Sequence, residues 1–180
     1  LCIRDSYKLI APFDVRHLVY DPYLDEATAS QHEIERADLP TVLAQADFVV
    51  VVCTLTEETR HLIGAAELRQ MKSSAYLVNV ARGGIIDQQA LARALAADEI
   101  RGAGLDALDP EPIAPDDPLL RLDNVNLTPH ALGITDEMMR RCSELCVQGT
   151  LDVMRGETPA SVVNRAVLQQ GKLQDKLAAY

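Results

Sequence analysis

The sequence predicts an α/β fold, a doubly wound parallel sheet, and three observations support this prediction. Short apolar runs of strand length alternate along the chain with segments rich in helix-forming residues. Some of these runs are unbroken in apolar residues, as is typical of strands that are buried on both faces of a sheet. The chain has 180 residues, of which 48% are hydrophobic, which suffices for one well-packed domain with an appendage.

The first part of the chain alternates in this way from its beginning. We expect, in order, the end of a helix at 6–13, a strand at 17–20, a short strand at 32–36, a helix at 39–46 and a strand at 47–53. The last of these, DFVVVVC, is the clearest candidate for a strand with both faces buried.

The second part continues the alternation. We expect a helix at 64–71, a strand at 75–81, a helix at 87–99 that begins with an acidic cap, strands at 102–108 and 124–130, and helices at 135–154 and 167–179. The proline-rich stretch DPEPIAPDDP, residues 109–118, is expected to be a loop. We place the sheet domain in residues 1–130 and the C-terminal helices in residues 131–180.

Charge and composition exclude several classes of partner. The net charge is −10, the isoelectric point is near 4.8, and the chain has no basic run, so we expect neither nucleic acid nor a membrane as a partner. No apolar stretch has the length of a membrane span, and the first residues lack the pattern of a secretory signal. We therefore expect a cytoplasmic protein.

The four cysteines favour the same compartment. Cys2, Cys53, Cys142 and Cys146 form no CxxC pair, and too few other ligands lie near them for a metal site. We expect no metal and interpret all four as buried free thiols, which fits a reducing cytoplasm.

Reactive side chains follow several of the predicted strands. Arg82 comes after LVNVA, Asp106 ends GAGLD, Glu111 lies in the loop beyond it, and His130 ends NVNLTPH. Each has an ordinary structural alternative, since an arginine pairs with surface acids and an aspartate before proline, as at Asp21, starts a turn. Because the carboxyl ends of parallel strands meet at one edge, we expect these residues to lie together.

Together these residue types suit the reduction of a 2-keto acid. The new hydroxyl needs a proton donor, and histidine titrates near neutrality. A carboxylate beside the histidine favours the imidazolium and orients the ring. Arginine presents a planar fork that matches the substrate carboxylate. The hydride must come from a cofactor.

The motifs in their order and spacing resemble those of the D-isomer-specific 2-hydroxyacid dehydrogenases, a family that includes phosphoglycerate dehydrogenase, D-lactate dehydrogenase and hydroxypyruvate reductase. The matching pieces are HLVYDPY, LTEETRHLI, MKSSAYLVNVARGGIIDQQAL, GAGLDALDPEP, DDPLLRLDNVNLTPH and VVNRAVL. The resemblance runs from about Arg4 to the C-terminus. It implies a Rossmann-type NAD-binding domain, an NAD-dependent oxidoreductase and, for the full-length enzyme, a homodimer.

The resemblance also implies residue roles. Arg82 would bind the substrate, His130 would be the acid/base, and Glu111 would be its partner. Asp21 would bind the adenosine ribose and, by repelling a 2′-phosphate, favour NAD over NADP. The expected cofactor-binding set is Asp21, Pro22, Thr54, Leu55, Ala81, Arg82, Asp106 and His130, in which Asp106 would hold the nicotinamide carboxamide.

The chain departs from the family pattern at a few positions. Thr54 stands where the family has proline, Ser73 and Ser74 stand where it has Pro-Gly, and GLDAL lacks the usual aromatic residue. The spacing from Asp21 places the third glycine of the cofactor motif at Ile3. We therefore expect the first strand, the glycine-rich loop and the preceding substrate half-domain to be missing, so that the strands at 17–20 and 47–53 lose their shared neighbour.

Three hypotheses remain open. The chain is the NAD-binding part of a dehydrogenase and is inactive alone, or it is a non-catalytic cofactor-sensing or interaction module, or it is a truncated gene product without function.

Overall fold

The computed structural model describes residues 8–31 and 34–171, and the chain divides into two compact units, Leu1–Ala131 and Leu132–Tyr180. Ile3, Cys2 and the predicted helix residues from 172 onward lie outside the described residues, as do His32 and Glu33 of the predicted short strand. The two units are described separately.

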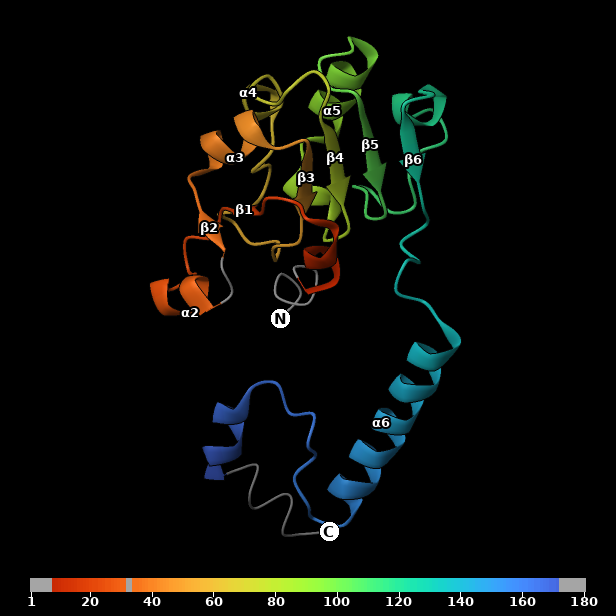
Figure 1. Cartoon of the computed structure of the whole chain (residues 1–180). Coiled ribbons are helices and arrows are strands. Elements are labelled where there is room, and N and C mark those ends of the chain that lie inside the picture. Colours follow the sequence, from red (N-terminus) through yellow and green to blue (C-terminus); the bar gives the residue numbers. More distant parts are fainter. Residues whose placement is uncertain (1–7, 32–33, 172–180) are drawn as a thin grey trace. The chain divides into compact units, whose positions relative to one another are not determined.

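The first unit contains two parallel sheets among its described residues (Figure 1). In the smaller sheet, β1 (Leu18–Val19) pairs with β2 (Glu35–Arg36). The larger sheet has the order β3-β4-β5-β6, with β3 at Phe48–Val51, β4 at Tyr76–Asn79, β5 at Gly102–Leu105 and β6 at Val125–Leu127. Every strand pair is parallel, which confirms the predicted parallel α/β class.

Helices connect these strands at nearly all of the predicted positions. They are the 3-10 helix η1 (Ala11–Phe13), α2 (Glu26–Gln31), α3 (Leu39–Gln45), α4 (Ala65–Leu68), η2 (Gly83–Ile85), α5 (Gln88–Ala96) and η3 (Pro118–Arg121). The side chain of Asp38 caps α3, and that of Asp87 caps α5, because a carboxylate accepts hydrogen bonds from the free amides of a first helical turn. Three of these elements, α2, η2 and η3, lie outside the predicted helices.

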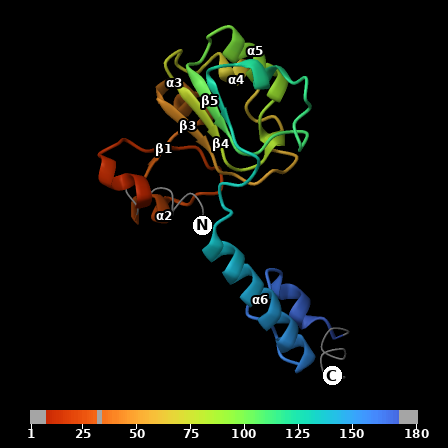
Figure 2. The same ribbon diagram turned by 90° about the vertical axis from the view of Figure 1, so that its right-hand side faces the viewer.

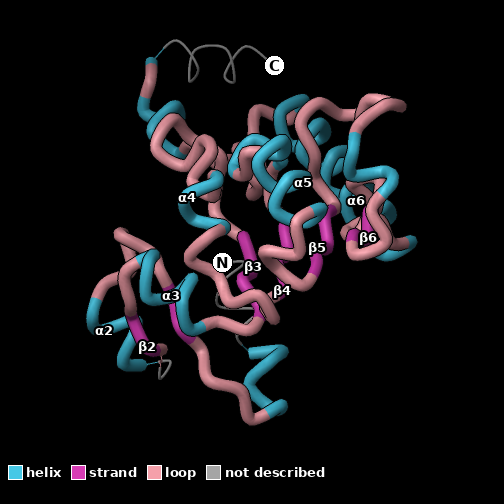
Figure 3. Tube along the Cα trace, turned by 90° about the horizontal axis from the view of Figure 1, so that it is seen from above, coloured by secondary structure: helices cyan, strands magenta, loops and turns pink. Residues whose placement is uncertain are grey.

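The core lies on one face of the larger sheet. Val49, Val51, Leu77 and Leu105 point to this face and are buried against the apolar side chains of α4 and α5. Figures 2 and 3 show α4 and α5 together beside strands β3, β4 and β5. This packing fixes the carboxyl ends of the four strands, from which the reactive side chains emerge.

The opposite face of β3 is exposed, so the prediction that residues 47–53 are buried on both faces is wrong. Phe48 is 66% exposed and Val50 is 46% exposed, and Phe48 stacks on Tyr76 with ring centroids 5.4 Å apart. Alternate residues of a strand face opposite sides, and the helices of the core cover only one of them. Within the described residues, β1 and β3 belong to separate sheets.

The second unit consists mainly of α6 (Asp136–Met154), which begins after the capping side chain of Thr135. A 3-10 helix, η4 (Arg165–Gln169), covers the start of the predicted last helix. Cys142 and Cys146 are exposed, so the prediction that they are buried is wrong, because α6 buries none of its residues.

Cys53, in the first unit, is half-buried and free. Within the described ranges, no three His, Cys, Asp or Glu side chains cluster closely enough to hold a metal ion. The described helices include none long and apolar enough to cross a membrane.

Candidate active site

The loop that carries Arg82 is closed by a buried asparagine at the end of β4. Asn79 is 1% exposed, its Nδ2 donates to the carbonyl of Arg82 at 3.0 Å, and its Oδ1 accepts from the amide of Ala81 at 3.0 Å. The Arg82 side chain is exposed, and its Nη1 donates to the carbonyl of Ala81. Asn79 therefore fixes the backbone from which the guanidinium extends.

Gly83 lets this loop approach the loop that carries Glu111. A Cβ atom at Gly83 would lie 2.1 Å from the carbonyl carbon and oxygen of Leu108 and 2.6 Å from the amide of Asp109. Only glycine allows such close contact between two backbones. Gly83 therefore allows the loops that carry Arg82 and Glu111 to lie this close together.

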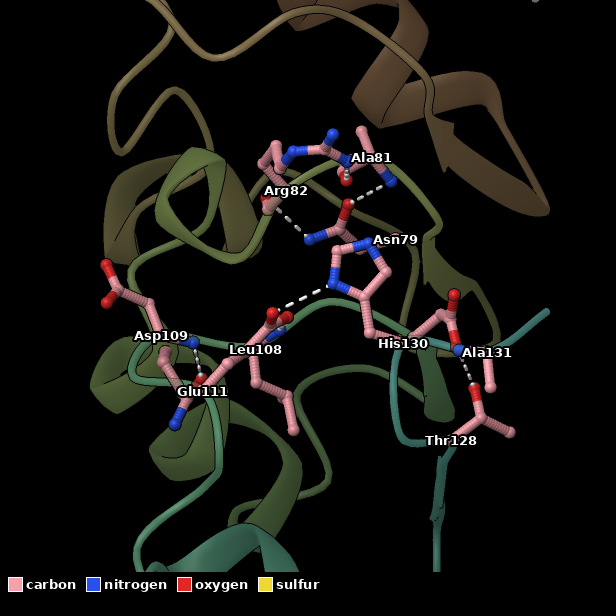
Figure 4. A network of polar contacts seen from close by, with 11 residues as sticks. Asn79, Ala81, Arg82, Leu108, Asp109, Glu111, Thr128, His130 and Ala131 are labelled. Atoms are coloured by element: carbon pink, nitrogen blue, oxygen red, sulfur yellow. Dashed lines mark hydrogen bonds and ion pairs between the residues drawn. The ribbon is translucent and has the colours of Figure 1, made fainter. Parts of the chain in front are cut away.

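His130 and Glu111 form a hydrogen-bonded pair at the carboxyl edge of the sheet. Nδ1 of His130 lies 2.8 Å from Oε2 of Glu111, and Oε1 of Glu111 accepts from the amide of Leu108 at 2.9 Å. Figure 4 shows the two side chains pointing toward one another. The hydrogen bond with His130 lowers the pKa of Glu111, and the Leu108 amide and the charge of Arg82 add to this effect.

Asp106 ends β5 and is 7% exposed. Its Oδ1 accepts from the hydroxyl of Thr128 at 2.6 Å and from the amide of Ala131 at 2.9 Å. Its amide donates to the carbonyl of Asn79, which joins β5 to the end of β4. Asp106 is therefore tied to the segment that contains His130.

Gln88 is a further polar residue at this edge that the sequence analysis missed. Its Oε1 accepts from the amide of Asp109 at 3.0 Å, and its Nε2 donates to Asp117 at 2.8 Å. Gln88 thus holds both ends of the proline-rich loop that presents Glu111. A glutamine in the first turn of a helix carries no signal that would distinguish this role in advance.

Asp21 and Pro22 lie at the carboxyl end of β1, beside a hollow of about 310 Å³. Oδ1 of Asp21 accepts from the amide of Tyr23 at 2.9 Å, so Asp21 also starts the turn that was its structural alternative. Arg36 and Asp38, which the sequence analysis did not select, line the same hollow.

Thr54 and Leu55 belong to the neighbouring loop after β3. The carbonyl of Thr54 accepts from the Thr59 hydroxyl at 2.7 Å, which closes a tight turn, and Leu55 packs partly against the core. The hydroxyl of Tyr23 donates to Glu58 at 2.8 Å and so connects this loop with the turn at Asp21. That hydrogen bond raises the pKa of Tyr23.

The predicted residues thus fall into two groups. Arg82, Asp106, Glu111 and His130 follow β4, β5 and β6 at one edge of the larger sheet, with Ala81 beside Arg82. Asp21 and Pro22 follow β1, and Thr54 and Leu55 follow β3. In the group after β1 and β3, the carboxylate of Asp21 at the rim of a hollow can accept hydrogen bonds from ribose hydroxyls. In the group after β4, β5 and β6, the polar side chains can bind a carboxamide and an organic acid. The residues therefore fit a dinucleotide such as NAD.

Comparison with known proteins gives the same result for most of the chain. Residues 4–131 match the family described as "D-isomer specific 2-hydroxyacid dehydrogenase, NAD binding domain". Glyoxylate reductase of Korarchaeum cryptofilum is 43% identical over 157 residues, which are 87% of this chain and 47% of that protein. D-3-phosphoglycerate dehydrogenase of Methanocaldococcus jannaschii is 39% identical over 169 residues, which are 93% of this chain and 32% of that protein.

The fold is also that of solved members. The NAD-complexed form of the D-isomer specific 2-hydroxyacid dehydrogenase from Lactobacillus delbrueckii ssp. bulgaricus has a TM-score of 0.80 and 31% identity, over 89% of this chain and 52% of that one. The chain thus spans about half the length of the first relatives that it matches. It belongs to the D-isomer specific 2-hydroxyacid dehydrogenase family and carries that family's NAD-binding domain.

Proposed function

We propose that this chain is the cofactor-binding half of an NAD-dependent oxidoreductase that interconverts a 2-keto acid and a D-2-hydroxy acid. The observation that carries the proposal is the His130–Glu111 pair, 2.8 Å apart, on loops beside that of Arg82. These are the groups needed to bind a keto acid and to protonate its carbonyl oxygen during reduction. They lie at the edge where parallel α/β sheets bind ligands.

In this proposal His130 is the acid/base. Glu111 engages Nδ1, so Nε2 is the atom that donates a proton to the substrate carbonyl oxygen during reduction and takes it back during oxidation. Glu111 is ionised because its pKa is lowered, and its charge stabilises the imidazolium before the proton is given up.

Arg82 would bind the substrate. Its guanidinium is exposed on a loop that Asn79 holds, so the planar fork is available to a carboxylate and an adjacent carbonyl. Bound NADH would supply the hydride for the keto carbon.

The cofactor would be held by the two groups of residues already described. Asp21, Pro22, Thr54 and Leu55 would take the adenosine side, while Ala81 and Asp106 would take the nicotinamide side. The carboxylate of Asp21 would favour NAD over NADP, since a second negative charge from a 2′-phosphate would be repelled.

The proposal also covers the complete enzyme, of which this chain would form about half. Residues 131–180 would return to a substrate domain, and two copies of the complete enzyme would form a dimer, which sedimentation measurements would test. The free thiols of Cys53, Cys142 and Cys146 support a reducing compartment, and we propose the cytoplasm.

The test is consumption of NADH by the complete enzyme in the presence of 2-keto acids such as glyoxylate and hydroxypyruvate. We expect turnover with at least one 2-keto acid, and we expect His130→Ala to lower kcat by about 10²- to 10⁴-fold. Full activity of His130→Ala across the pH range would refute the assigned role.

A non-catalytic module would behave differently in the same experiment. The complete protein would be stabilised by NADH in a thermal-unfolding assay but would not oxidise it with any 2-keto acid. A gene product without function would show neither stabilisation nor turnover.

A further inference from the structure

The turn that presents His130 has an unusual backbone. His130 has φ 54°, in the left-handed region that residues other than glycine rarely adopt. Such a conformation persists only where the surrounding structure holds it. Pro129, which precedes it, has no amide hydrogen to contribute, so the constraint must come from residues on either side.

One carboxylate oxygen supplies this constraint. Oδ1 of Asp106 accepts from the hydroxyl of Thr128 at 2.6 Å and from the amide of Ala131 at 2.9 Å. In the sequence the two donors stand on either side of the Pro129–His130 pair, and Figure 4 shows both on the side of His130 that faces away from Glu111. Because Asp106 is 7% exposed, water competes little for these bonds, and bonds to a charged acceptor are strong.

The strand before the turn is equally well fixed. The amide of Thr128 donates to the carbonyl of Leu105 at 3.0 Å, which continues the β5–β6 pairing to the residue before Pro129. Thr128 is thus bound through its backbone to β5 and through its side chain to the residue that follows β5. A substitution can therefore remove the Thr128 hydroxyl and leave the backbone pairing with β5 in place.

We propose that Thr128 is a positioning residue for His130, because its hydroxyl and the Ala131 amide clamp the turn onto Asp106 and so hold the imidazole against Glu111. Asp106 then has a structural task besides the carboxamide contact that was expected of it. The inference rests on the proposed function only in taking His130 as the reacting group.

Two substitutions at Thr128 distinguish the effect of the hydroxyl from the effect of side-chain size. Thr128→Val keeps the shape and removes the donor, which leaves a buried carboxylate with one hydrogen bond fewer. Thr128→Ser keeps the donor and removes a methyl group. Thr150→Val is the matched control, since the Thr150 hydroxyl bonds only a helix carbonyl, that of Cys146 at 2.9 Å.

The first readout is the titration of the Glu111 carboxyl, followed by NMR in this chain labelled with ¹³C at glutamate carboxyls. In the parent and in Thr128→Ser and Thr150→Val, we expect its pKa to lie below the ordinary value, because His130 is held beside it. In Thr128→Val the pKa should rise toward the ordinary value. An unchanged Glu111 titration in a folded Thr128→Val variant would overturn the proposal.

If Thr128→Val does not fold, Asp106→Asn takes its place, since it keeps the acceptor oxygen and removes the charge, and the same rise in the pKa of Glu111 is expected.

The second readout is kcat of the complete enzyme. Thr128→Val should lower kcat about tenfold or more, with Thr128→Ser within about threefold of the parent, while KM for NADH stays unchanged in both.

The two proposals fail separately. The Glu111 titration needs neither NAD nor substrate, so its failure would remove the clamp and leave the dehydrogenase assignment standing. An enzyme without turnover whose Glu111 titration responds to Thr128→Val would remove the proposed function alone.

Discussion

Replacing Gly83 by alanine should separate the two loops that carry Arg82 and Glu111. The new Cβ would lie 2.1 Å from the carbonyl group of Leu108, whereas ordinary contacts begin near 3.4 Å, so the backbones must move apart by about 1.3 Å. The contacts are with backbone atoms of Leu108 and Asp109, so rotation of a side chain cannot relieve them. Overpacking of this kind costs about 3 kcal/mol of stability, and a misplacement of about 1 Å costs about 100-fold in turnover.

The neighbouring glycine provides the control. A Cβ at Gly84 would meet only side-chain atoms, the nearest being Cδ2 of Leu55 at 3.3 Å, so small shifts accommodate it. In urea unfolding followed by far-UV circular dichroism, the free energy of unfolding should fall strongly in Gly83→Ala and by less than about 1 kcal/mol in Gly84→Ala. Equal stability of Gly83→Ala and the parent would refute the close approach on which the site geometry depends.

Three further predictions concern single polar groups. Asn79→Ala removes the acceptor of the Ala81 amide and one of the two donors to the Arg82 carbonyl, which also accepts from the amide of Ile85. It should lower the free energy of urea unfolding by about 2 kcal/mol, whereas Ala at the exposed Asn126 should change it by less than about 0.5 kcal/mol; equal losses would contradict the loop-closing role. The pKa of Glu111 is lowered in the folded state, so its ionised form stabilises the fold above the ordinary glutamate pKa and this contribution is lost as the pH falls through the lowered value. The difference in unfolding free energy between the parent and Glu111→Gln should therefore shrink on acidification, and a constant difference would exclude the ion pair. Asp21→Ala should weaken NADH binding to the complete enzyme about tenfold or more and reduce the preference of the enzyme for NADH over NADPH. Asp123→Ala, at an exposed position, is the control. Unchanged NADH binding in Asp21→Ala would show that Asp21 is not part of the cofactor site.

The fold was predictable where pattern and capping agree. The acidic cap predicted at residue 87 is formed at the start of α5, and the helix predicted at 39–46 is present as α3, which the structure shows capped by Asp38. The exposure of Phe48 and Val50 was not predictable, because an apolar run indicates burial without telling which neighbouring elements supply the cover. The 3-10 turn at 165–169 likewise depends on local contacts that periodicity does not report.

The candidate site was predictable to the level of its reactive groups. His130, Glu111 and Arg82 could be selected because their strands end at one edge, and Nδ1 of His130 lies 2.8 Å from Oε2 of Glu111. Their roles stay predictions. The residues that hold them were not selected for this role, since Gln88 and Thr128 act through single hydrogen bonds made across loops. Only the three-dimensional structure brings these partners together.

The family resemblance supplied roles that the geometry supports without testing them. Asp21 lines a hollow, as a ribose ligand should, but it also starts a turn, and both uses are compatible because the Tyr23 amide engages Oδ1. Arg36 lines the same hollow and is paired with Glu26 at 3.0 Å. A guanidinium already bound to a carboxylate attracts a 2′-phosphate less strongly, which is consistent with the proposed preference for NAD.

The most direct test of the central claim is to follow the transferred hydrogen. The complete enzyme would be supplied with NADH that carries deuterium at both C4 positions of the nicotinamide and with a 2-keto acid, and the products would be analysed by mass spectrometry and NMR. We predict one deuterium at C2 of a D-2-hydroxy acid and one deuterium retained at C4 of NAD+, with product formation greatly reduced in His130→Ala. A product without deuterium, or equal product from His130→Ala, would contradict the assignment of this chain to hydride transfer with His130 as its acid/base.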